Sequence, residues 1–385
     1  MNDINGYYSC SINPNYISTW YTPFVRKARA DFGSVLNFLD SPEQSTETIE
    51  YEHSDFWEDR SYPEPSKAIP VNFADNSHHG RISLTALKKI KKAIDYTVYL
   101  ATPKSLPHTL KGKDFKFRLN FITLTLSSPQ IHPDIEIKEK IFQPMLNSFR
   151  QKFKVINYVW RAEKQSNDNI HFHIVTDKFI PWNELRNEWN RHQQNLGYVT
   201  RYRERLIEFH KDGFHYRPEL ESHWNRIAQY KAYQLGKRNN WDNPNSSDVH
   251  SLQNVSNVKS YFVKYLTKDN QSDYNRKYPI KPDAEPLIDQ PVQYSNLEGR
   301  LWGCSERLSK IQGARADLDN ELTEELTRIK QNDSVHHFDG DFFSVSFVNI
   351  EYLIKEGFTV IPKLFEDFIR ATFPEYRPKD LFSID

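Results

Sequence analysis

The sequence, 385 residues long, predicts an α+β fold. Residues 117–126, 155–163 and 170–177 are rich in β-branched and aromatic side chains, a composition that is typical of strands. Residues 83–94 and 135–153 instead repeat their apolar side chains at the helical period. Only a short polar turn separates the second and third strands, so these two are expected to pair as an antiparallel hairpin.

The first 80 residues contain no long periodic segment and include an acidic stretch over residues 40–59. Their many aromatic side chains, among them Tyr7, Tyr8 and Trp20, nevertheless argue against full disorder. The segment that follows, residues 83–94, carries four lysines between its apolar positions and predicts a basic amphipathic helix.

The central segments predict further elements in order. Strand 117–126 lacks Gly and Pro and is expected in the interior of a sheet. Pro144 must start, kink or split the helix at 135–153. Asn183 is expected to cap a helix that runs to about residue 195.

The pattern over residues 198–245 is irregular and mostly polar, apart from a helix expected near 219–235. A helix with a serine cap is expected over 256–268. The C-terminal part is expected to contain an acidic helix, then a strand at 342–348 and a helix near 362–372.

Charge is distributed unevenly, although basic and acidic residues balance at 51 each. Residues 1–80 hold 5 basic and 12 acidic residues, residues 317–385 hold 7 and 15, and residues 81–316 hold 39 and 24. These shifts predict an acidic, aromatic-rich N-terminal extension, a basic central domain and an acidic C-terminal region. A basic, aromatic centre favours a nucleic-acid partner, because cations neutralise phosphates and rings stack on unpaired bases. An ordinary lysine-rich surface would have the same composition.

Several classes of protein are excluded by composition. With 26% charged residues and no apolar run of membrane-spanning length, the chain is expected to be soluble and intracellular. Its two cysteines, Cys10 and Cys304, fit a reducing compartment better than a disulfide framework or a zinc motif. None of its 12 glycines forms a nucleotide-binding loop, so an ATP-driven step would need a partner protein.

Two histidines and a carboxylate form a candidate metal site. Alternation along strand 170–177 directs His171 and His173 to one face, opposite an apolar face. If the hairpin folds about Asn167, Glu163 lies across from His171 on the same face. Such a mixed nitrogen and oxygen set suits Mn²⁺ or Mg²⁺, with zinc as an alternative. The histidine pair alone is a weak signal, since about 0.5 such pairs are expected by chance.

A tyrosine pair forms the second candidate site. On the helix expected at 256–268, Tyr261, Tyr265 and Lys268 share one face. A phenol with a pKa near ~10 attacks poorly unless a cation stabilises the phenolate and a metal activates the phosphorus; Lys268 and the metal could do so. Tyr198 and Tyr202 repeat the tyrosine spacing but lack the lysine.

In this order, residues 121–126 (FITLTL), His171-Phe172-His173 and the tyrosine helix resemble the three motifs of HUH endonucleases. They are most similar to the two-tyrosine rolling-circle replication initiators of single-stranded DNA bacteriophages and some plasmids. Residues 248–252 and 301–305 are also similar to phage initiators, so the resemblance covers residues 115–310. Phe172 departs from the aliphatic residue that is usual there.

The resemblance implies a central antiparallel sheet with flanking helices and a metal carboxylate at Glu163, with Asp168 and Asp177 nearby. It also implies that one tyrosine attacks a DNA phosphate, which leaves a 5′-phosphotyrosine and a 3′ hydroxyl that primes synthesis. The second tyrosine then cleaves after one round, and the released hydroxyl closes a circle. The implied partners are single-stranded origin DNA, a host helicase and a DNA polymerase in the cytoplasm of a bacterial host, without a membrane.

Other interpretations stay open at this point. An HUH transposase or relaxase would use the same site, and a non-catalytic protein that binds single-stranded DNA would use the same residues for packing and stacking. His250 either lines the site or has a structural role. Arg161 and Lys164 flank Glu163 and either hold phosphates or lie in solvent.

Overall fold

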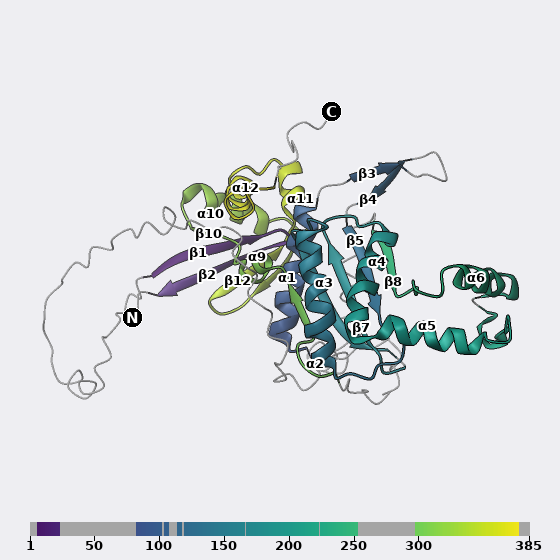
Figure 1. The fold of residues 1–385 in the computed structure, drawn as a ribbon. Helices are drawn as coiled ribbons and strands as arrows, with labels where there is room; N and C mark the ends of the chain where they lie inside the picture. Colours follow the sequence, from purple (N-terminus) through teal and green to yellow (C-terminus); the bar gives the residue numbers. More distant parts are fainter. Residues whose placement is uncertain are drawn as a thin grey trace, which may run out of the picture.

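A computed structural model describes residues 6–23, 82–101, 104–107, 114–117, 119–165, 167–222, 224–252 and 297–376. Two five-stranded antiparallel sheets with helices packed on them form the described part of the chain (Figure 1). The α+β prediction is therefore confirmed.

The first sheet contains the predicted hairpin. Its strand order is β8 (Ser247–Leu252), β5 (Leu119–Thr125), β7 (Ile170–Thr176), β6 (Tyr158–Lys164) and β9 (Trp302–Cys304). β5 has a neighbour on each side, as predicted from its composition. The β6–β7 register pairs Glu163 with His171, which confirms the expected hairpin.

Helices cover one face of this sheet through large aromatic side chains. They are α2 (Asp134–Ile137), the π-helix η1 (Lys138–Phe142), α3 (Gln143–Gln151), α4 (Trp182–Gln193) and the 3₁₀ turn η2 (Gln194–Leu196). Phe142 stacks on Phe172 with ring centroids 3.9 Å apart. The π turn ends just before Pro144, so the predicted split of this helix is confirmed.

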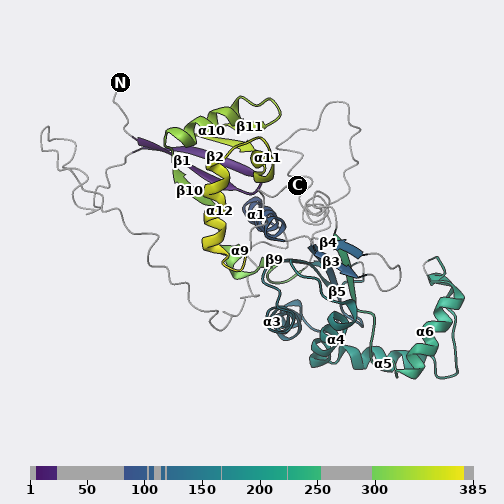
Figure 2. The same ribbon diagram turned by 90° about the horizontal axis from the view of Figure 1, so that it is seen from above.

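α1 (Leu84–Leu100), capped by Ser83, contacts β6 and β9, and Figure 2 shows it on the side of the sheet opposite α3 and α4. The short α9 (Glu306–Lys310) packs beside it. β3 (Lys104–Pro107) and β4 (Asp114–Phe117) form a separate two-stranded sheet.

The second sheet joins both ends of the chain. Its order is β10 (Ala314–Asp317), β1 (Gly6–Asn13), β2 (Tyr16–Pro23), β12 (Phe343–Phe347) and β11 (His336–Asp339). Three helices accompany it: α10 (Asn320–Lys330), α11 (Ile350–Lys355) and α12 (Val360–Thr372). The three C-terminal elements expected from the sequence are confirmed, whereas the β1–β2 hairpin was not expected. The division at residues 80 and 316 remains a prediction.

Two sequence expectations are wrong. Residues 198–209 are not irregular but form α5 (Tyr198–Phe209). This helix buries only Tyr198 and Val199, so it needs no continuous apolar stripe, and its arginines, glutamates and leucine favour helix. Asn183 does not cap α4, which begins at Trp182 after Pro181, without a side-chain cap.

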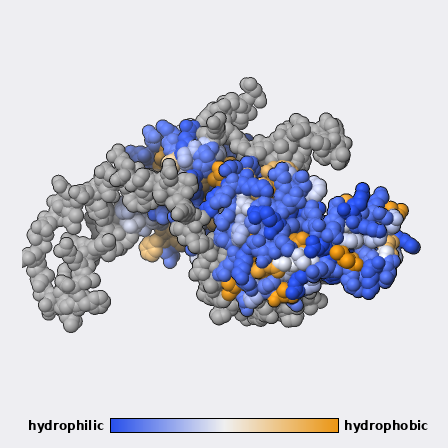
Figure 3. Space-filling model, viewed as in Figure 1, coloured by the Kyte–Doolittle hydropathy of each residue, from blue (hydrophilic) through white to orange (hydrophobic). Residues whose placement is uncertain are grey.

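α5 belongs to an arm, residues 198–242, that projects from the body in Figures 1 and 2. The chain returns through η3 (Pro218–Leu220) and α6 (Arg226–Arg238), which is capped by Asn225. The helix expected near 219–235 is thus confirmed with shifted ends. Figure 3 shows hydrophobic residues on this arm among hydrophilic ones, and Ile227 and Leu235 are exposed.

Cys10 and Cys304 are free, as expected. None of the helices in the described part of the chain has the length and apolar character that a bilayer crossing requires. The helix expected at 256–268, with Tyr261, Tyr265 and Lys268, lies outside the described residues.

Candidate functional site

The β6–β7 hairpin brings Glu163, His171 and His173 together on the face of the sheet opposite α3 and α4. His171 and His173 are two residues apart on β7, and their ring centroids are 4.4 Å apart. Glu163 faces His171 across the ladder, and its Oε1 lies 2.8 Å from His173 Nε2. One potential ligand atom from each side chain lies within 4.8 Å of the others. No second group of this kind occurs in the described ranges.

Burial makes these side chains available as ligands. His171 and His173 are 8% and 6% exposed, whereas the Glu163 side chain is 24% exposed and reaches toward solvent. His171 Nδ1 is buried and has no hydrogen-bond partner among the described residues. A buried imidazole nitrogen without a partner loses hydration and gains nothing in return, unless a cation or another ligand binds it.

The protonation states also favour a cation. Burial, followed by the charge of His173, lowers the pKa of His171 to about 4, so this ring is neutral at pH 7 with a free lone pair. Burial raises the pKa of Glu163, but the hydrogen bond and charge of His173 and the charge of Arg161 outweigh it and lower that pKa. The group therefore combines two neutral nitrogen donors with one carboxylate, a donor set suited to a divalent metal.

Neighbouring residues fix the orientation of His173. Its Nδ1 lies 3.3 Å from Thr123 Oγ1 on β5, and its ring lies against Phe121 with centroids 5.4 Å apart. If the Thr123 hydroxyl donates to Nδ1, the proton resides on Nε2, between this nitrogen and Glu163. A metal ion would displace that proton. Thr123 was not singled out from the sequence, because its role requires the β5–β7 register, which pairs it with His173.

The structure separates the flanking cations. Arg161 pairs with His173 in the ladder and is 3% exposed, so it is not in solvent. Lys164 instead forms an ion pair of 2.7 Å with the buried Asp134. Asp168 and Asp177 are not part of the metal-ligand group, although both were considered as its carboxylate from the sequence.

The base of the hairpin is held by side chains that the sequence did not reveal. Asp134 accepts a hydrogen bond from the Glu298 backbone at 3.1 Å, and Lys138, from the π turn, donates to the Glu298 carbonyl. These contacts attach the chain before β9 to the helices that cover the sheet. Burial lowers the pKa of Lys138 to about 8.

The backbone of β8 places two further residues beside this face. Asp248 pairs with Thr123 and His250 with Phe121. The His250 side chain lies outside the described residues. The role expected for it stays a prediction.

Residues 120–270 match a family of replication-associated proteins, the ORF2 type. This region of 151 residues includes the whole metal-ligand group, the arm and the predicted tyrosine segment. Comparison with curated proteins and with solved structures gives no match. The matched region is therefore similar to replication-associated proteins, in agreement with the role in DNA replication expected from the sequence.

Proposed function

We propose that this protein initiates rolling-circle DNA replication as a two-tyrosine HUH endonuclease. It nicks single-stranded DNA at a replication origin and rejoins it through a 5′-phosphotyrosine intermediate, in a reaction that depends on Mg²⁺ or Mn²⁺. The Glu163–His171–His173 group is the observation that supports this proposal most strongly. The replication-associated family of residues 120–270 supports the biological role.

Glu163, His171 and His173 would hold the metal ion. The donor set fits, because two neutral imidazoles and a carboxylate converge and His171 Nδ1 has no other partner among the described residues. A divalent ion bound there would polarise a phosphate oxygen and make the phosphorus more electrophilic. Thr123 keeps the His173 ring in place, and the charge of Arg161 helps to keep Glu163 ionised.

The nucleophile in this proposal is the hydroxyl of Tyr261 or Tyr265. A bond forms between the tyrosine Oη and phosphorus, the bond from phosphorus to the 3′ oxygen breaks, and the phenol proton is transferred to the departing oxygen. Lys268, one turn from Tyr265, stabilises the phenolate. Because one phosphodiester replaces another, bond energy is conserved and no nucleotide hydrolysis is needed.

Replacing both tyrosines tests this assignment. Tyr261→Phe/Tyr265→Phe removes two hydroxyls and should leave no covalent DNA adduct, whereas binding of single-stranded DNA should change little. Of the single variants, one should lose the initial nick and the other should impair joining, or each should be partly covered by its neighbour. The measurement is adduct formation with single-stranded DNA from the replicon that encodes the chain, with Mg²⁺, Mn²⁺ or a chelator.

Tyr202→Phe is a matched control, because Tyr202 repeats the tyrosine spacing on α5. Its adduct yield should equal that of the wild-type protein. An adduct that survives the double substitution, or metal-independent nicking, would contradict the proposal. If the chain binds single-stranded DNA and forms no adduct with any metal, the non-catalytic alternative holds. Mapping the peptide that carries the adduct identifies the attacking tyrosine.

A further inference from the structure

A groove of about 510 Å³ lies where the arm leaves the body of the protein. One wall is the loop after β5, with Ser128, Pro129 and Ile131. The other wall is the first half of α5, which contributes two arginines and one glutamate: Arg201, Glu204 and Arg205. All three of these charged side chains are exposed.

The loop wall of this groove is attached to the hairpin that carries the metal-ligand group. Gln130 Oε1 accepts a hydrogen bond of 2.7 Å from the backbone of Ile170, the residue before His171. Asn169 binds the same loop twice, through Gln130 N at 2.8 Å and the Ser128 carbonyl at 3.2 Å. The loop therefore cannot move far without moving the end of β7.

The arginine wall is attached to the same loop. The Tyr198 hydroxyl, at the start of α5, accepts hydrogen bonds of 3.3 Å from the backbone of both Ile131 and His132. Ser128 Oγ donates to the Tyr198 carbonyl at 3.2 Å. Arg201 and Arg205 follow on the next two turns of α5, so both walls and the hairpin form one connected unit.

The two arginines have unused hydrogen-bonding capacity. Neither one forms an ion pair with a carboxylate in the part of the chain that the structure describes, although Arg205 lies over the Tyr202 ring at 5.9 Å. Arg203, between them in sequence, is paired with Asp242 at 3.0 Å. At i and i+4, Arg201 and Arg205 lie on the same side of the helix and can contact successive anionic groups.

A polymer of phosphodiesters fits these features. The guanidinium groups donate to phosphate oxygens, and the groove is open, so a continuous strand can pass through it. Glu204 weakens the attraction but does not cancel two positive charges. We propose that this groove binds the phosphate backbone of single-stranded DNA next to the strand segment held at the metal-ligand group. The inference rests on the proposed function, since it concerns the DNA that the enzyme cuts.

Binding measured against salt concentration tests the groove. The full-length chain is titrated with a labelled single-stranded oligonucleotide in the presence of a chelator, so that no cleavage occurs. Arg201→Gln/Arg205→Gln should weaken binding about tenfold and reduce the slope of log Kd against log salt by about 1.4, the value expected for two lost contacts to a single strand. Glu204→Gln should strengthen binding about twofold, because it removes a repulsive charge.

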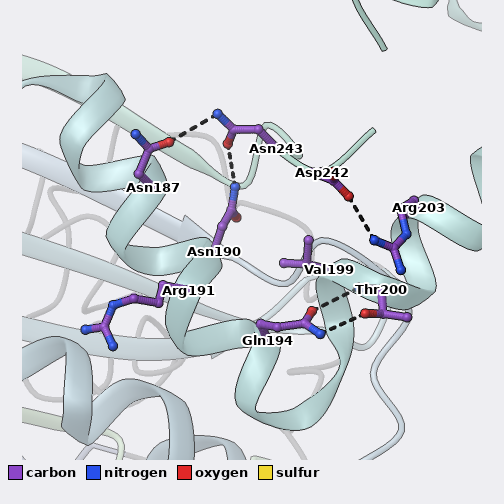
Figure 4. A pocket seen from close by; sticks show the side chains of 9 residues that line it. All are labelled: Asn187, Asn190, Arg191, Gln194, Val199, Thr200, Arg203, Asp242 and Asn243. Atoms are coloured by element: carbon purple, nitrogen blue, oxygen red, sulfur yellow. Dashed lines mark hydrogen bonds and ion pairs between the residues drawn. The ribbon is translucent and has the colours of Figure 1, made fainter. Parts of the chain in front are cut away.

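Arg203→Gln is the matched control. Figure 4 shows Arg203 on the neighbouring cavity of about 440 Å³, where it bonds Asp242 and points away from the loop wall described above. Its affinity for DNA and its salt slope should equal those of the wild-type protein. Circular dichroism and thermal unfolding of each variant establish that the exposed substitutions leave the fold intact.

The outcomes separate this inference from the proposed function. Unchanged affinity and salt slope in Arg201→Gln/Arg205→Gln would overturn the groove, and so would an equal loss in Arg203→Gln. Metal-dependent nicking by the wild-type chain, measured in parallel, is judged independently. If the wild-type protein binds single-stranded DNA through the groove but never nicks it, the groove stands and the endonuclease assignment fails.

Discussion

Two buried glutamate–histidine groups lie on opposite faces of the first sheet, and they differ in how completely their glutamate is bonded. Glu188, on α4, accepts hydrogen bonds of 2.7 Å from both Ser148 and Lys152 and a further bond from Arg191. His192 lies 3.3 Å from the same carboxylate. Glu163, in contrast, has a contact of 2.8 Å with His173 and leaves the lone pair of His171 Nδ1 unused within the described residues.

The histidines are perturbed alike, so burial alone does not distinguish the two groups. Burial and a neighbouring cation lower the pKa of His192 to about 4, the value found for His171. Burial opposes ionisation of Glu188, but hydrogen bonds from Arg191, Lys152 and Ser148 lower its pKa to about 2. A carboxylate with four donors has no capacity for a metal ion, whereas the group at Glu163 has unused donor atoms. The number of unfilled coordination positions indicates which group is functional.

The largest expected effect comes from removing a metal ligand. His171→Ala, His173→Ala and Glu163→Ala should each reduce nicking by about 10³-fold or more, because the polarising ion is lost. Their free energy of unfolding without metal should change by less than about 1 kcal/mol for Glu163, which is partly exposed. Nicking rates and chemical denaturation measure the two quantities.

Metal-dependent stabilisation provides the control for these variants. At a metal concentration of about 100 times Kd, the wild-type protein should gain about 2.7 kcal/mol of stability, and each variant should gain much less. Normal cleavage by Glu163→Ala would show that a different carboxylate is the third ligand, and the two groups would then differ less than the structure indicates.

A smaller effect, on stability and not on catalysis, is expected at the other group. Glu188→Ala should lower the free energy of unfolding by about 2 kcal/mol, because buried Ser148 and His192 lose their acceptor while Lys152 and Arg191 remain largely in water. The nicking rate of the folded variant and its stabilisation by metal should not change. A loss of metal-induced stabilisation in Glu188→Ala would remove the distinction between the two groups.

The smallest effect concerns acid stability. The pKa of Glu188 is lower in the folded protein, near 2, than in the unfolded chain, near ~4.3, so the stability it contributes is present above pH ~4.3 and is lost as the pH falls toward 2. Between pH 7 and pH 3, the wild-type protein should therefore lose about 1–2 kcal/mol more stability than Glu188→Gln. Urea denaturation at several pH values measures this difference, and parallel curves for the two proteins would contradict it.

Local sequence patterns predicted the core of the candidate site. Alternation along residues 170–177 placed both histidines on one face, and the short turn placed Glu163 opposite His171, as the β6–β7 register has it. These features depend on neighbours within about ten residues, for which the strand period is sufficient. The assignment of Tyr261, Tyr265 and Lys268 remains a prediction.

The sequence by itself determined the elements whose apolar pattern is periodic: the strands of the hairpin, the helix α1 and the split helix at Pro144. Only the tertiary structure decided which charges are buried, because desolvation depends on segments far apart in the chain. Arg161 is buried whereas Arg201 is exposed, and neither outcome follows from local composition. The pairing of β1 with β10 joins residues about 300 positions apart, and such a pairing is selected by the shared core and not by any local period.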